Sequence, residues 1–215
     1  MSLLITAFGR FDGGPNCSEA LLDRLRAERG ALETEWGAPV ACELLAVDTA
    51  GVDAALKAAL STHRPTHVLL TGQAAGRDAL TFERVARNRR DLGVADCRGR
   101  IGPLGPVRAG GPDRRAATWP DLDGLCAALA ADGLPARPSD DAGTHLCNQT
   151  LYLALEAAET ADPPFVATFL HLPLLPEQVA AAVPAAARLE ACFALPLDDM
   201  ARAVRLVLRH TRRDA

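Results

Sequence analysis

Residues 52–61 read VDAALKAALS and residues 67–72 read HVLLTG. The apolar side chains of the first run recur at helical spacing. The second run is continuously apolar and ends at Gly72, which is typical of a buried strand. A helix followed directly by a buried strand is the repeating unit of α/β proteins. The same alternation extends in both directions along the chain.

Strand-like and helical runs fill most of the remaining sequence. Further strands are predicted at Leu3–Phe8, Val40–Val47 and Pro164–Leu172, with shorter extended pieces at Thr81–Asn88 and Leu134–Pro138. Further helices are predicted at Ser18–Glu28, Asp121–Ala131, Asn148–Glu159, Pro176–Glu190 and Asp198–His210. This order predicts an α/β sandwich with a largely parallel sheet, whose functional residues lie beyond the carboxyl ends of the strands.

Composition excludes several classes of protein. A chain of 215 residues fits one domain, and its net charge of −4 with scattered arginines argues against nucleic acid as a partner. We expect no membrane span and no signal peptide, because the apolar start reads as a first strand. Six cysteines without a CxxC pair indicate reduced thiols in a cytoplasm and argue against a zinc site. Residues 93–120 are rich in Gly and Pro and are expected to form a long loop, acting either as a lid or as a solvated excursion.

Cys147 is the first candidate for chemistry. It lies in the sequence SDDAGTHLCN (139–148), where a glycine-containing turn gives way to a helical pattern. A thiol at a helix start meets unpaired backbone N–H groups and the positive end of the helix dipole, and both favour the nucleophilic thiolate. The alternative is a small buried apolar side chain, which is the commoner use of a cysteine.

Two further polar residues lie at the edges of predicted strands. Glu83 follows the small-residue loop GQAAG (72–76), and His171 lies near the carboxyl end of an apolar strand. Taken singly, Glu83 fits a surface ion pair and His171 fits a core histidine. Together with Cys147 they supply a nucleophile, a base and a carboxylate that orients the base.

Four motifs, taken in their order along the chain, resemble the pyroglutamyl peptidase I family, also called pyrrolidone-carboxylate peptidases. They are the glutamate signature at 72–88, the cysteine signature at 142–148, the histidine segment at 171–178, and Thr6-Ala7-Phe8 with Phe11 and Gly13-Gly14. The resemblance runs nearly end to end. It implies a cysteine peptidase that removes N-terminal pyroglutamate from peptides, in which Cys147 is the nucleophile, His171 the base and Glu83 the residue that orients His171.

The resemblance also implies the architecture and the substrate site. The expected fold is a single domain, a three-layer α/β/α sandwich around a mostly parallel, mixed sheet, assembled as a homo-oligomer (commonly a tetramer) and needing no metal or cofactor. Phe8 and Phe11 are expected to pack on the pyroglutamate ring, and the segment of Gln73 to hold its lactam. His145 and Leu146, just before the nucleophile, complete the expected substrate site.

Four positions depart from the family pattern. His145 stands where the family has an aromatic residue, and Gly93 stands where many bacterial members carry an arginine on the oxyanion side. Arg89 and Arg90 lie nearby as candidates to replace that arginine. Arg10 and Cys17 each replace a proline close to Phe11. His145 and Gly93 favour one alternative, a related cysteine amidohydrolase with another small-lactam or acyl-amide specificity. A further alternative is a weakly catalytic homologue that binds pyroglutamyl ligands or serves as a structural partner.

Overall fold

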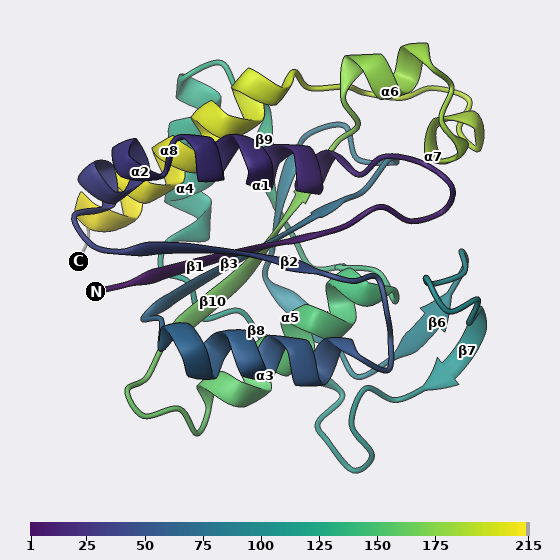
Figure 1. Cartoon of the computed structure of the whole chain (residues 1–215), viewed down its shortest axis with the longest axis horizontal. Helices are drawn as coiled ribbons and strands as arrows, with labels where there is room; N and C mark the ends of the chain where they lie inside the picture. The colour runs from purple at the N-terminus through teal and green to yellow at the C-terminus, as the bar shows by residue number, and fades with distance from the viewer. Residues whose placement is uncertain (214–215) are drawn as a thin grey trace.

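The computed structural model describes residues 1–213, and within them the centre is a six-stranded sheet (Figure 1). Its order is β2 (Val40–Leu45), β1 (Leu3–Phe8), β3 (His67–Gln73), β10 (Val166–Leu172), β4 (Leu80–Glu83) and β9 (Ala136–Ser139). The first four strands run parallel to one another, β4 is antiparallel to β10, and β9 is parallel to β4. The predicted mostly parallel, mixed sheet is confirmed.

Helices cover both faces of the sheet, as the α/β/α prediction requires (Figure 1). One face carries α1 (Cys17–Ala27), α2 (Arg29–Trp36), α4 (Leu122–Ala131) and α8 (Leu197–Arg213). The other face carries α3 (Val52–His63) and α5 (Leu146–Ala158). Each face has its own cluster of buried apolar side chains, so the sheet is the middle layer of three.

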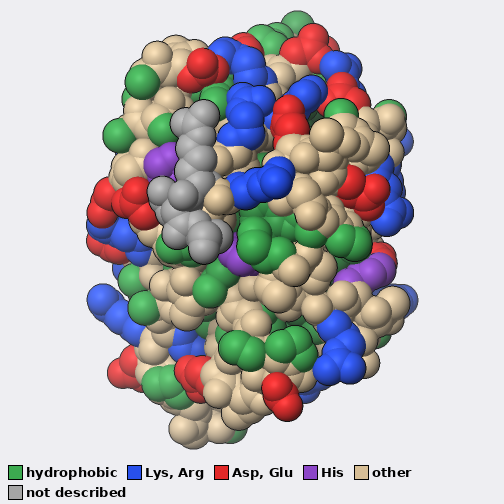
Figure 2. Space-filling model, turned by 90° about the vertical axis from the view of Figure 1, so that its left-hand side faces the viewer, with side chains coloured by type: hydrophobic (Ala, Val, Ile, Leu, Met, Phe, Trp, Pro, Cys, Tyr) green, Lys and Arg blue, Asp and Glu red, His purple; other side chains and the backbone are tan. Residues whose placement is uncertain are grey.

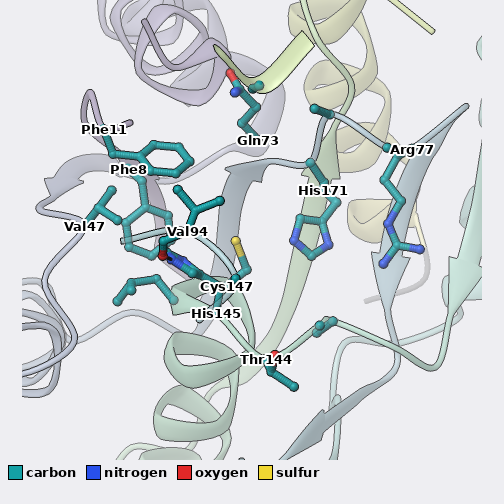
Figure 3. Close-up of a pocket in the computed structure, with 18 of the residues that line it drawn as sticks. Phe8, Phe11, Val47, Gln73, Arg77, Val94, Thr144, His145, Cys147 and His171 are labelled. Atoms are coloured by element: carbon teal, nitrogen blue, oxygen red, sulfur yellow. Dashed lines mark hydrogen bonds between the residues drawn. The ribbon is translucent and has the colours of Figure 1, made fainter. Parts of the chain in front are cut away.

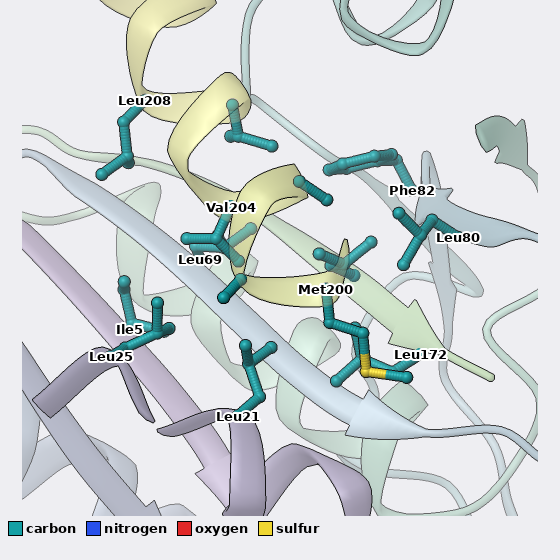
Figure 4. Packing of buried hydrophobic residues seen from close by; sticks show 14 of the residues in the cluster. Ile5, Leu21, Leu25, Leu69, Leu80, Phe82, Leu172, Met200, Val204 and Leu208 are labelled. Atoms are coloured by element: carbon teal, nitrogen blue, oxygen red, sulfur yellow. The ribbon is translucent and has the colours of Figure 1, made fainter. Parts of the chain in front are cut away.

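The packing of α1 and α8 shows what holds the first face together. Leu21, Leu25 and Val204 are fully buried and point at Ile5 and Leu69 of the sheet (Figure 4). Burying one such aliphatic side chain contributes about 1.5–3 kcal/mol, so these contacts dominate the stability of this layer. The helical spacing of apolar residues in α1 is what makes the contact possible.

Several predicted elements differ from those observed. The single helix expected at 176–190 is two short ones, α6 (Pro176–Ala180) and α7 (Pro184–Ala187). The chain bends between them because Ala182 has a positive φ of 46° and because Pro184 lacks the N–H needed to continue a helix. Helix α2 was not predicted. Cys17 is the first residue of α1 and is fully buried.

The region between β4 and α4 is more structured than the long loop that was predicted. It contains β5 (Val85–Arg87), β6 (Arg90–Leu92), β7 (Gly102–Gly105) and β8 (Arg114–Ala116), which pair as β5–β8 and β6–β7. The extended piece predicted at 81–88 is therefore split between two sheets. The β6–β7 pair projects from one end of the molecule (Figure 1). The buried carboxylate of Asp96 holds the loop between β6 and β7 by accepting hydrogen bonds from Thr49 and Arg100.

Charges of both signs are mixed on the surface. On the face seen in Figure 2, basic and acidic side chains lie next to one another. On α8, Arg205 pairs with Glu35 and Arg202 with Asp132. Such mixing agrees with the absence of a basic stripe in the sequence. Within residues 1–213 no helix is long and apolar enough to cross a membrane.

Candidate active site

His171 and Glu83 are brought together by neighbouring strands. On the antiparallel pair β10–β4, Glu83 lies opposite Phe169, two residues before His171, so both side chains project from the same face. The His171 Nδ1 atom lies 2.7 Å from Glu83 Oε1. Both side chains are nearly or fully buried. Because an ionised carboxylate can only accept a hydrogen bond, Nδ1 donates and carries a proton.

Cys147 approaches the same imidazole from the other side. It is the second residue of α5, whose N-cap residue His145 makes no side-chain cap, and its sulfur faces His171 (Figure 3). A Cβ added to Gly72 would lie 3.0 Å from the Cys147 Sγ and 2.8 Å from Phe169 Cζ. Gly72, next to His171 in the β3–β10 register, therefore leaves the space that the sulfur occupies.

The electrostatics of His171 follow from these neighbours. Burial alone would lower its pKa, but the Cys147 thiolate and the Glu83 carboxylate outweigh burial and raise the pKa of His171 to about 9. The charged imidazolium is thus favoured between two anions. A thiolate paired with an imidazolium is the reactive form of a cysteine nucleophile.

A cavity of about 540 Å³ opens beside the sulfur. Its walls include the five residues predicted from the sequence to contact substrate: Phe8, Phe11, Gln73, His145 and Leu146. Val47 and Val94 lie with the phenylalanines on one side of Cys147, and Arg77 lies beyond His171 on the other (Figure 3). Apolar walls with a few polar groups suit a small, nearly neutral ring.

Gln73 and His145 are both held in place by hydrogen bonds. Gln73 Oε1 accepts from the backbone N–H of Cys17 at 2.9 Å and from Gln178 Nε2 at 2.8 Å. Its amide NH₂ is left to meet a ligand. His145 Nε2 lies 3.0 Å from the Val94 carbonyl oxygen and its ring is 6.0 Å from that of Phe11. Burial lowers the pKa of His145, which favours its neutral form. The neutral ring forms part of the cavity wall at the position where the family pattern has an aromatic residue.

The two arginines proposed to replace the one missing at Gly93 do not reach the cavity. Arg89 is exposed and pairs with Asp91, and Arg90 donates to the Leu104 carbonyl oxygen. That expectation was wrong, because the β6 hairpin directs both side chains elsewhere. Gly93 itself lines the cavity.

Val47, Arg77 and Val94 are among the cavity residues that sequence reasoning missed. Val47 follows β2 at its carboxyl end, where the topology rule for α/β sheets would have placed it. Arg77 lies in the small-residue loop after β3, six residues before Glu83, which was a usable signal for an ion pair. Val94 had no signal, because its place depends on how the loop after β6 folds. Among residues 1–213 no group of three potential metal-binding side chains is found.

A thiol at a helix start, a buried imidazole and a buried carboxylate on an α/β/α sandwich are the arrangement of a cysteine hydrolase. The chain belongs to the pyroglutamyl peptidase family, whose model matches residues 1–211. The family and the class of enzyme predicted from the motifs are confirmed.

Individual relatives agree with this assignment. The chain is 37% identical to a pyrrolidone-carboxylate peptidase of Streptococcus pyogenes over 180 residues, which cover 83% of this chain and 80% of the relative. A mutant pyrrolidone carboxyl peptidase from Pyrococcus furiosus superposes with a TM-score of 0.88 at 26% identity, covering 100% of this chain and 99% of that one. Pyroglutamyl peptidase I of Bacillus amyloliquefaciens gives 0.85 at 27% identity, covering 99% and 97%.

Proposed function

We propose that this chain removes pyroglutamate from the N-terminus of peptides by a Cys147–His171–Glu83 mechanism. The observation that carries the proposal is the buried His171 imidazole, hydrogen-bonded at 2.7 Å to Glu83 while its other side faces the Cys147 sulfur. The apolar walls around Phe8 and Phe11 support a ring-shaped substrate.

The reaction begins with attack of the Cys147 thiolate on the pyroglutamyl carbonyl carbon. A C–S bond forms and the carbonyl electrons move onto oxygen. The first backbone N–H groups of α5, including that of Cys147, lack acceptors within the helix, which supports their assignment as the donors to this oxyanion. His171 then gives its proton to the leaving amine as the C–N bond breaks.

Hydrolysis of the thioester completes the cycle. Water attacks the acyl carbon while His171 takes its proton, and the C–S bond breaks to release pyroglutamate and the thiolate. The Glu83 carboxylate stabilises the imidazolium each time it forms. The proposal requires no metal or cofactor.

The expected assembly and location are part of the same proposal. We take the whole chain as one peptidase domain that acts on peptides in the cytoplasm as a homo-oligomer. All six cysteines are free, which suits a reducing compartment. Sedimentation of the purified protein would measure the number of subunits.

Release of p-nitroaniline from pyroglutamyl p-nitroanilide tests the activity. We expect turnover by the wild type, none above background with Cys147→Ala, and unchanged turnover with Cys97→Ala, since Cys97 is exposed and does not line the cavity. A folded, reduced wild type that leaves this amide intact would contradict the proposal. The alternatives, altered small-lactam or acyl-amide specificity or ligand binding alone, would then be separated with a panel of such amides and by calorimetry.

A further inference from the structure

Apart from His171, Arg77 is the one cationic side chain that contacts the Glu83 carboxylate in the described part of the chain. Its Nη2 lies 3.0 Å from Glu83 Oε1, the same oxygen that accepts from His171. The Arg77 side chain is about a quarter exposed, whereas that of Glu83 is fully buried. A buried carboxylate is costly unless a cation or several donors compensate it.

The same guanidinium nitrogen also contacts the turn that leads to the nucleophile. Arg77 Nη2 donates to the carbonyl oxygen of Asp141, which lies five residues before Leu146, the first residue of α5. The Asp141 carboxylate is not used in this contact; it accepts from Gly143 N within the turn. One side chain therefore links the loop after β3, the carboxylate on β4 and the turn before α5.

Glu83 has few other partners. Its Oε2 is buried and finds no hydrogen-bond donor among the described residues, so both of its charged contacts converge on Oε1. Without Arg77, the carboxylate would keep the imidazole as its single polar contact. Its negative charge would then be offset from within the catalytic group alone.

We propose that Arg77 is a positioning residue for the hydrolysis proposed above: it compensates the buried Glu83 carboxylate, holds it toward His171 and fixes the turn that leads to Cys147. The inference rests on the proposed function for its kinetic consequences but not for its electrostatic ones. Arg77 acts through Glu83 and Asp141 and takes no part in bond making.

The surrounding charges allow a directional expectation. His171 faces Glu83 and Cys147, and Glu83 faces Arg77 and His171. Of the nearby carboxylates, Asp78 is paired with Arg137, and Asp141 lies 3.9 Å from Arg87. Removing the positive charge of Arg77 makes loss of a proton from this group, above all from the His171 imidazolium, occur at higher pH. Both limbs of the pH profile of kcat/KM should therefore move upward.

The test compares Arg77→Met, Arg77→Lys and Arg84→Met. Arg84 makes two 2.9 Å contacts with Asp140, so its loss loosens the same turn without touching the Glu83 carboxylate. We expect Arg77→Met to shift both limbs upward by about one pH unit or more, and Arg77→Lys to restore their positions but not the full kcat. Arg84→Met should leave both limbs in place.

A second readout does not need the substrate. The rate at which iodoacetamide alkylates Cys147, followed by mass spectrometry of the peptide that contains it, should show the same upward shift in Arg77→Met. Limbs unmoved in Arg77→Met, or moved equally by Arg84→Met, would overturn the inference. If the wild type fails to cleave the pyroglutamyl amide, the proposed function fails, and the alkylation profile still decides the role of Arg77.

Discussion

His171 Nδ1 and Arg77 Nη2 both bond to one oxygen of Glu83, Oε1, at 2.7 and 3.0 Å, while Oε2 has no donor among the described residues. An amide in place of the carboxylate can therefore keep both contacts, with its oxygen at Oε1 and its NH₂ at the empty position. This separates the charge of Glu83 from its geometry.

Glu83→Gln is expected to lower kcat by about 10²-fold or more, because a neutral amide no longer stabilises the imidazolium. Glu83→Leu should cost more, since it also loses the hydrogen bond that orients His171. The measurement is kcat on a pyroglutamyl anilide together with circular dichroism of each variant. Equal activity of Glu83→Gln and wild type would show that the charge is not used.

The pKa of His171, raised to about 9 by Cys147 and Glu83 against the effect of burial, predicts a basic limit of activity. We expect kcat/KM to fall as the pH passes that value, because the imidazolium that protonates the leaving amine is lost. The pKa of His171 in the folded protein lies above the unfolded value of about 6.5. The charged His171 imidazolium with its two anionic partners therefore stabilises the fold fully below about pH 6.5, and this contribution is lost as the pH rises through 9.

NMR titration of the His171 ring measures this shift directly. In Cys147→Ser the thiolate is absent, so the pKa of His171 should fall relative to the wild type. A value for His171 that is the same in both proteins would contradict the ion pair, since Cys147 is one of the causes of the rise.

Gly72→Ala is expected to reduce activity severely and to destabilise the fold by about 1–3 kcal/mol through overpacking. The added Cβ would lie 2.8 Å from Phe169 Cζ and 3.0 Å from the Cys147 Sγ, so the sulfur must move. Gly76→Ala is the matched control for stability, because nothing lies within 4 Å of its Cβ position. Thermal unfolding and Cys147 alkylation of both variants check this; similar losses in the two would contradict the steric argument.

Much of the catalytic site was predictable because its members lie at ends of regular elements. The alternation of apolar runs gave the sheet, and motif order gave Cys147, His171 and Glu83 as candidates, which the structure places together. What sequence could not supply was strand direction: β4 runs antiparallel to β10, and this register alone places Glu83 beside His171.

Other features depended on tertiary contacts that leave little trace in sequence. The polar Asp96 looked like an ordinary loop residue, yet it is buried and accepts hydrogen bonds from Thr49 and Arg100. Its contacts fix the region after β6, and with it Val94 as a cavity wall. Arg89 and Arg90 were misplaced for the same reason, since the direction of β6 decides where they point.

His67 predicts how the fold responds to acid. Its ring lies edge-on to Trp36 and Trp119, with centroids 5.0 and 5.3 Å away. Burial, followed by the positive N-terminus, lowers its pKa. The folded pKa therefore lies below the unfolded value of about 6.5, so the unfolded chain binds protons more readily and stability is lost as the pH falls below that value.

Replacing this histidine with a ring that does not titrate isolates the effect. His67→Phe keeps an aromatic ring between the two tryptophans but cannot take up a proton, so its free energy of unfolding should fall less between about pH 7.5 and 5 than that of the wild type. Urea unfolding at both pH values gives the difference. The contribution of His145, whose pKa is also lowered by burial, is common to both proteins and cancels. Parallel losses in the two proteins would mean that His67 is not the group that links this fold to acid.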